Sequence, residues 1–153
     1  MLLFLVQHGA ATNEAEDPDR PLTDRGVTDV RWVAGAATDA GLVTVDRVIH
    51  SGKTRARQTA ELWGEALAVG VDEADGLAPL DDPAIWAARL ARADWPERSM
   101  LVGHLPHLAR LAGLLVIGDP EREPIAFRPG GLVGLEAGAS GWSVGLVLPP
   151  PQA

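Results

Sequence analysis

The sequence contains no cysteine among its 153 residues. A disulfide framework and a zinc site built from thiolates are therefore both excluded. It also lacks any apolar stretch of 18 residues, and no charged segment precedes the apolar run at its N-terminus. We therefore expect neither a transmembrane helix nor a signal peptide, and a cytoplasmic location is the simplest inference.

Positive charge is also scarce. The chain has 13 lysine and arginine residues against 21 aspartate and glutamate residues, and its only lysine is Lys53. The resulting net charge of −8 argues against nucleic acid as a partner. Because 46% of the residues are hydrophobic and 22% are charged, a disordered chain is not expected. We expect residues 1–153 to form a single domain with a real core.

Short apolar runs alternate with segments of helical periodicity. Strands are expected over residues 2–7, 45–50, 71–74, 99–103, 131–136 and 142–148, and helices over 24–40, 53–68, 84–92 and 105–116. Thr23 is the expected N-cap of the first helix and Gly41 fits its C-terminal end. The last two runs have only a short connection between them, which predicts a hairpin. The alternation predicts an α/β sheet with right-handed crossovers.

Polar residues directly follow three of the predicted strands. His8 follows the first strand, the segment from Ser51 to Arg55 follows the second, and His104 follows the run that ends at Gly103. The carboxyl ends of parallel strands meet at one edge of a sheet, where ligands bind in open α/β folds. A strand-end histidine can simply cap the sheet, but Gly9 would leave room for a ligand beside His8. We therefore expect these residues to converge.

A cluster of cations at the start of the second helix points to an anion. Lys53, Arg55 and Arg57 lie where the helix dipole disfavours positive charge. A bound phosphate would explain them, because a helix N-terminus and arginine side chains both bind phosphate. Ser51 could add a hydroxyl contact or could only turn the chain. Arg20, in the acidic loop before the first helix, is a second candidate for phosphate binding.

Four stretches occur in a specific order: Gln7-His8-Gly9, Arg20-Pro21-Leu22-Thr23, the segment from Ser51 to Thr59, and Gly103-His104-Leu105-Pro106. They resemble the histidine phosphatase superfamily, in particular its small SixA-like phosphohistidine phosphatases. The resemblance extends over nearly the whole chain. It implies a three-layer α/β/α sandwich with a mixed, mainly parallel sheet, as in phosphoglycerate mutase-like proteins. It also implies a phosphatase that uses neither a metal ion nor another cofactor.

The same resemblance implies roles for single residues. His8 would attack phosphorus and become a phosphohistidine, which water then hydrolyses. His104 would donate a hydrogen bond to a phosphoryl oxygen, while Arg55 and Arg20 hold the phosphate. The implied partner is a phosphohistidine-bearing protein, with no role for nucleic acid or a membrane. Two alternatives stay open: a small-molecule phosphomonoesterase, and a catalytically weak phosphate- or phosphoprotein-binding module.

Gln7 departs from the family motif, which opens Arg-His-Gly. Glutamine can still hydrogen-bond to a phosphate but carries no charge. A lost charge-assisted hydrogen bond is worth about 1.5–3 kcal/mol, which corresponds to roughly ten- to a hundredfold in rate. Lys53 is a possible compensating cation.

A general acid for an alkoxide leaving group is the other open question. Asp81 and Asp82 lie in the region where many family members carry one, but Asp82 before Pro83 equally fits a helix N-cap. His107 is expected on a helix surface, and His50 is not assigned a role.

Overall fold

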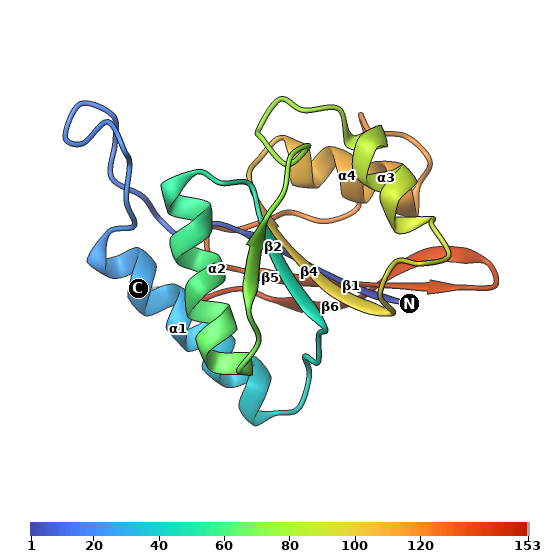
Figure 1. Cartoon of the computed structure of the whole chain (residues 1–153), viewed down its shortest axis with the longest axis horizontal. Helices are drawn as coiled ribbons and strands as arrows, with labels where there is room; N and C mark the ends of the chain where they lie inside the picture. The colour runs from blue at the N-terminus through green and yellow to red at the C-terminus, as the bar shows by residue number, and fades with distance from the viewer. Residues whose placement is uncertain (153) are drawn as a thin grey trace.

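The structure is a computed structural model that describes residues 1–152. Its six strands form one sheet in the order β3-β2-β4-β1-β5-β6 (Figure 1). The strands are β1 (Leu2–Gln7), β2 (Arg47–His50), β3 (Val71–Glu73), β4 (Arg98–Gly103), β5 (Leu132–Gly138) and β6 (Gly141–Leu148). The helices are α1 (Asp24–Asp39), α2 (Thr54–Leu67), α3 (Pro83–Leu90) and α4 (His107–Val116). Strands β1 to β4 run parallel, whereas β5 is antiparallel to both β1 and β6.

The alternation of side chains along β1 explains the layers. Phe4 and Val6 belong to the apolar cluster that includes residues of α1 and α2, whereas Leu3 and Leu5 belong to the cluster that includes residues of α3 and α4. Both faces of β1 are thus buried, as expected for a central parallel strand. Figure 1 shows α1 and α2 on one side of the sheet and α3 and α4 on the other. The predicted three-layer α/β/α sandwich is confirmed.

The helix ends follow the expected local chemistry. The Thr23 hydroxyl accepts the backbone N–H of Gly26 at 3.0 Å, and Gly41 leaves the last turn of α1 with φ of 67°. Asp82 caps α3 by accepting the N–H of Ala84 at 2.9 Å, with Pro83 in the first turn. The N-cap interpretation of Asp82 is therefore confirmed.

Several element boundaries differ from those expected by one or two residues, and two of them have a clear cause. The second strand begins at Arg47 rather than at residue 45, although Val45 is buried with the core. In the sequence, a buried apolar residue of a loop, such as Val45, cannot be distinguished from an apolar residue of the strand that follows. Helix α4 begins at His107 rather than at residue 105, because Pro106 serves as its N-cap. The predicted hairpin is present as β5 and β6.

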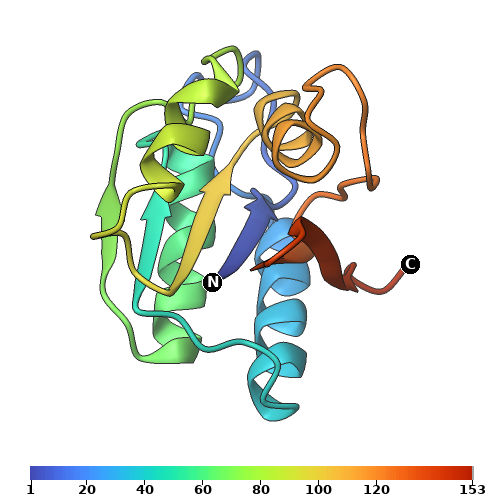
Figure 2. The same cartoon turned by 90° about the vertical axis from the view of Figure 1, so that its right-hand side faces the viewer.

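The loop after β1 packs tightly against α1. A Cβ atom on Gly26 would overlap the carbonyl oxygen of Ala10, so α1 can approach this loop only with glycine there. Figure 2 shows the carboxyl ends of β1, β2 and β4 at the same edge of the sheet. No helix within residues 1–152 is both long and apolar enough to cross a bilayer.

Candidate active site

His8 lies immediately after β1, with Nδ1 bonded to a carbonyl oxygen and Nε2 turned toward Arg55. Its Nδ1 is 2.8 Å from the carbonyl oxygen of Gly9, and because a carbonyl only accepts, Nδ1 carries the proton. Nε2 then keeps its lone pair. Burial lowers the pKa of His8 to about 4, the bond to Gly9 opposes this, and the charges of Arg55 and Arg20 lower the pKa further. His8 is therefore neutral at pH 7, as a nucleophilic imidazole must be.

Arg55 reaches His8 from the first turn of α2. Its Nε–H donates to Nε2 of His8 at 3.3 Å, which brings together residues 47 positions apart. Burial lowers the pKa of Arg55, and the nearby charge of Arg20 lowers it further, while Glu14 opposes the shift. Two cations at close quarters beside a neutral imidazole favour an anionic ligand. No side chain caps the first turn of α2, which also suits an anion.

Arg20 is held by the loop that follows β1. Its Nε–H donates to the carbonyl oxygen of Thr12 at 3.1 Å, and its backbone has φ of 48°, a conformation that is unfavourable for a residue with a side chain. Arg20 lies near enough to His8 and Arg55 for its charge to lower the pKa of both.

His104 completes the cluster from the end of β4. Its ring centroid is 5.0 Å from that of His8, and its Nε2 is 2.7 Å from the hydroxyl oxygen of Ser51. The His104 side chain is almost entirely buried, and burial lowers its pKa to about 3, with the charges of His8, Arg55, Lys53 and His107 acting in the same direction. The expected convergence of the three strand ends is therefore observed. Ser51 contacts His104 in addition to turning the chain.

Two further residues of the Ser51–Thr59 segment hold the loop that carries His8, a role that the sequence did not reveal. The buried hydroxyl of Thr59 accepts the N–H of Gly9 at 3.1 Å and donates to the carbonyl oxygen of Arg55 at 2.8 Å. The side-chain oxygen of Gln58 accepts the N–H of Leu22 at 2.8 Å. Thr59 thus links the backbones next to His8 and at Arg55. The sequence did contain a signal for this role. Gln58 and Thr59 belong to the signature segment and follow Arg55 by three and four residues, so one turn of α2 places them beside Arg55.

Gln7 and Lys53 flank this cluster. The Oε1 atom of Gln7 is buried and has no hydrogen-bond partner among residues 1–152. Lys53 is the N-cap of α2, is exposed, and its charge reaches His104. Lys53 therefore places a positive charge near the imidazole of His104, although position 7 lacks the arginine of the family motif.

The two acidic candidates are both engaged with backbone. Besides the cap that Asp82 provides, Oδ2 of Asp81 accepts the N–H of Ala78 at 2.9 Å.

The expected position of His107 on the helix surface is wrong. His107 is fully buried at the start of α4, a helix that packs against α3. His50 is also buried, and its Nδ1 accepts the N–H of Gly52 at 3.1 Å.

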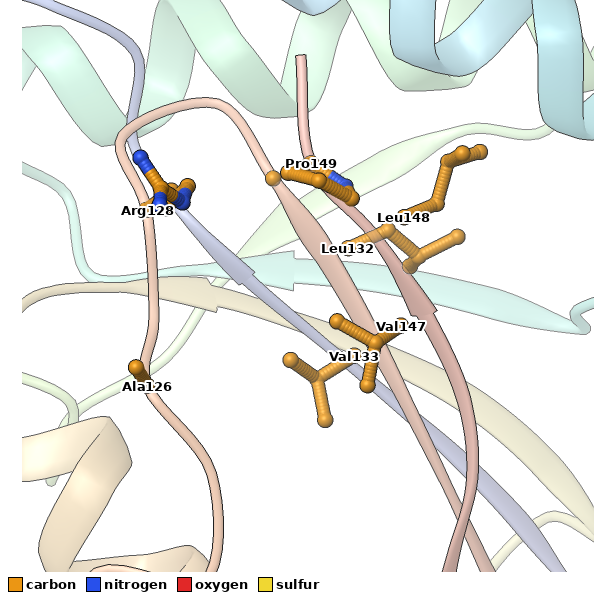
Figure 3. Close-up of a pocket in the computed structure, with 8 residues that line it drawn as sticks. Ala126, Arg128, Leu132, Val133, Val147, Leu148 and Pro149 are labelled. Carbon is orange, nitrogen blue, oxygen red and sulfur yellow. The ribbon is translucent and has the colours of Figure 1, made fainter.

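Among the described residues, neither a metal site nor the small apolar cavity drawn in Figure 3 forms part of this cluster. Within the described part of the chain, no three His, Asp or Glu residues are placed to hold a metal ion. A cavity of about 50 Å³ lies where β5 begins and β6 ends, and Figure 3 shows Leu132, Val133, Val147 and Leu148 around it. Its lining is mostly aliphatic and includes neither His8 nor His104, so it is a gap in packing rather than part of the site.

The fold and this cluster together define a class: an α/β protein whose sheet edge presents two imidazole rings and two guanidinium groups, a donor set suited to a phosphoryl group. Comparison with known proteins gives the family. Residues 3–82 match the model of the histidine phosphatase superfamily (branch 1), and the chain belongs to this family.

Three relatives illustrate the similarity. The chain is 34% identical to an uncharacterized protein of Picosynechococcus sp. over 92% of this chain and 87% of that protein. It is 33% identical to phosphohistidine phosphatase SixA of Escherichia coli (strain K12) over 78% of this chain and 76% of SixA. The structure of the protein histidine phosphatase SixA complexed with tungstate superimposes with a TM-score of 0.85, at 26% identity over 98% of this chain and 97% of that one.

Proposed function

We propose that this protein is a phosphatase that removes the phosphoryl group from phosphohistidine on a protein, through a covalent intermediate on His8 and without a metal ion. The observation that carries the proposal is the arrangement around Nε2 of His8. That atom carries the lone pair of the neutral ring, accepts the Nε–H of Arg55 at 3.3 Å and belongs to a ring 5.0 Å from a second imidazole. Nucleophile and oxyanion donors are thus adjacent, as phosphoryl transfer requires.

The first step exchanges one P–N bond for another. Arg55 first turns its Nε–H from Nε2 of His8 to a phosphoryl oxygen, which releases the lone pair. Nε2 then attacks phosphorus opposite the substrate imidazole, the P–N bond of the substrate breaks, and its electron pair leaves with the substrate nitrogen, which takes up a proton from the solvent. Arg55 and Arg20 neutralise the equatorial oxygens. His104 donates its Nε2–H to a phosphoryl oxygen once the Ser51 hydroxyl turns aside.

The second step returns the enzyme to its starting state. Water attacks phosphorus, the bond to Nε2 breaks, and its electron pair returns to His8, while the two protons of the water end on inorganic phosphate or the solvent. Because burial holds the pKa of His8 at about 4, the released imidazole is neutral and ready for another cycle.

The acidic residues support a phosphohistidine substrate over an alkyl phosphate. An alkoxide leaving group needs a strong proton donor, whereas imidazole is a much weaker base and leaves more readily. Asp81 and Asp82 each accept a backbone N–H, so one oxygen of each carboxylate is engaged in holding the local chain rather than directed at a leaving group. The similarity to SixA of Escherichia coli, whose name states this activity, supports the same substrate class.

A trapping experiment tests the proposal. A ³²P-labelled phosphohistidine protein is incubated briefly with the enzyme, quenched in cold alkali and digested for peptide mapping. We expect an acid-labile, alkali-stable label on His8 and none in the His8→Ala variant. A label on serine, or full activity of His8→Ala, would exclude the proposed nucleophile.

Parallel assays separate the alternatives. Turnover of an alkyl phosphate faster than turnover of the phosphohistidine protein would identify a small-molecule phosphomonoesterase. Tight binding of tungstate without release of phosphate from either substrate would identify a binding module.

A further inference from the structure

His107 is a buried titratable group for which the proposed reaction so far has no use. Its side chain is fully buried at the first position of α4, and neither ring nitrogen has a hydrogen-bond partner within residues 1–152. Buried polar groups are normally paired, and one that is not destabilises the fold. An aliphatic residue would fill the same space without that cost, so the imidazole calls for a functional explanation.

His104 has a matching unpaired atom. Its Nδ1 is buried without a partner, whereas its Nε2 lies against Ser51. The two histidines share one turn of chain, which is closed by a hydrogen bond from the N–H of Leu108 to the carbonyl oxygen of His104 at 2.9 Å. Three ring nitrogens without partners therefore lie within this turn, next to the proposed phosphate site.

Three charged groups lie near enough to act on the pKa of His107: Asp81 and Asp82, in the segment that leads into α3, and Arg110, on α4 itself. Helix α3, which packs against α4, carries Arg89, whose guanidinium is paired with Asp75. Strand β6, which also contacts α4, carries no charged residue. Burial lowers the pKa of His107 and Asp81 opposes this shift, so the ring is neutral near pH 7. Asp81 uses Oδ2 for the N–H of Ala78, which leaves Oδ1 for another donor.

We propose that His107 is a positioning residue that acts through His104. When the phosphoryl group is bound, one ring nitrogen of neutral His107 accepts the Nδ1–H of His104, and the other donates its N–H to Asp81. This arrangement stabilises the imidazolium form of His104, whose Nε2–H then points at the phosphoryl oxygen, in the way that a second group orients a catalytic imidazole. The two rings cannot both be charged, because adjacent imidazolium ions repel each other. This inference rests on the proposed function.

Histidine NMR gives a test that does not depend on turnover. The chain has only four histidines, so ¹⁵N-histidine labelling with single-histidine variants assigns each ring. In the tungstate complex, we expect His107→Leu to lower the titration midpoint of His104 by about one pH unit, a tenfold change in its protonated fraction. The thermal stability of the variant should be unchanged or higher, because two unpaired nitrogens are removed. An unchanged His104 midpoint would overturn the proposal.

Kinetics provide the second readout. The high-pH limb of kcat should move to lower pH by about the same amount in His107→Leu, while KM changes little. Asp81→Asn keeps an oxygen for the N–H of Ala78 but removes the charge, so it should reproduce part of the effect and add little to His107→Leu. Fully additive effects of the two substitutions would contradict a shared network. His107→Gln retains one donor and one acceptor and should give an intermediate shift; if His107→Leu does not fold, a wild-type midpoint in His107→Gln decides against the proposal.

Leu111→Ala is the matched control. Leu111 is fully buried on the same helix, so this substitution destabilises α4 without changing a polar group. It should lower stability and leave the His104 midpoint unchanged; an equal shift in Leu111→Ala would show that loosening of the helix is the cause. If the wild-type protein shows no phosphatase activity, the proposed function fails, and the tungstate titration still decides the role of His107.

Discussion

Acidification tests the protonation state of His8, the feature on which the proposed chemistry depends most. In the unfolded chain a histidine binds a proton below a pKa of about 6.5, whereas burial lowers the pKa of His8 in the folded protein to about 4. Between these values the unfolded state holds more protons, so stability falls as the pH falls. The difference between the two pKa values lowers the free energy of unfolding by about 3 kcal/mol between pH 7 and pH 4.

The assay compares the wild-type protein with His8→Asn, which keeps a polar side chain but does not titrate. Chemical unfolding at pH 7 and at pH 4 should show about 3 kcal/mol more acid destabilisation in the wild type. Groups elsewhere titrate in both proteins and largely cancel in this comparison. Direct NMR titration of His8 should give a midpoint near 4.

The same shift predicts the pH dependence of phosphoenzyme formation. At pH 5, about 90% of His8 is neutral if its pKa is about 4, but only about 3% is neutral at an ordinary pKa of 6.5. Single-turnover labelling should therefore persist at pH 5. A His8 midpoint at or above 6, together with equal acid sensitivity of the wild type and His8→Asn, would refute the reasoning.

Further predictions concern the groups around the nucleophile. Activity should survive EDTA because Arg55 is placed to neutralise the phosphoryl group; complete loss that a divalent ion restores would contradict this. If Lys53 replaces the missing family arginine, Gln7→Arg should change turnover little, and Lys53→Ala should cost much more activity in the native protein than in the Gln7→Arg background; additive effects on kcat/KM would exclude compensation. Thr59→Val should cost about 1–3 kcal/mol in denaturant unfolding, since it leaves the buried N–H of Gly9 unpaired; a neutral effect would show that Gly9 finds another partner.

Periodicity and chain order were enough to predict much of the architecture. The alternation of apolar runs and helical segments predicted an α/β sheet, and the capping residues predicted both ends of α1. The three layers were implied by the resemblance to the histidine phosphatase superfamily, not by the periodicity. The strand ends also indicated that His8, Arg55 and His104 would meet, because parallel strands place their carboxyl ends at one edge. These inferences succeed because they depend on local geometry and on a general property of parallel sheets.

Only the tertiary structure decided the state of the site. Sequence spacing could not show that Nδ1 of His8 is held by its neighbour's carbonyl, that Ser51 contacts His104, or that burial makes both imidazoles weak bases. The error at His107 has the same origin. Helical periodicity indicates which residues share a face, but whether the first turn of α4 is buried depends on how the helix packs against the rest of the fold. Burial and pKa are set by atoms distant in the sequence, so the sequence of this protein determined which groups gather, and only the fold determined their protonation.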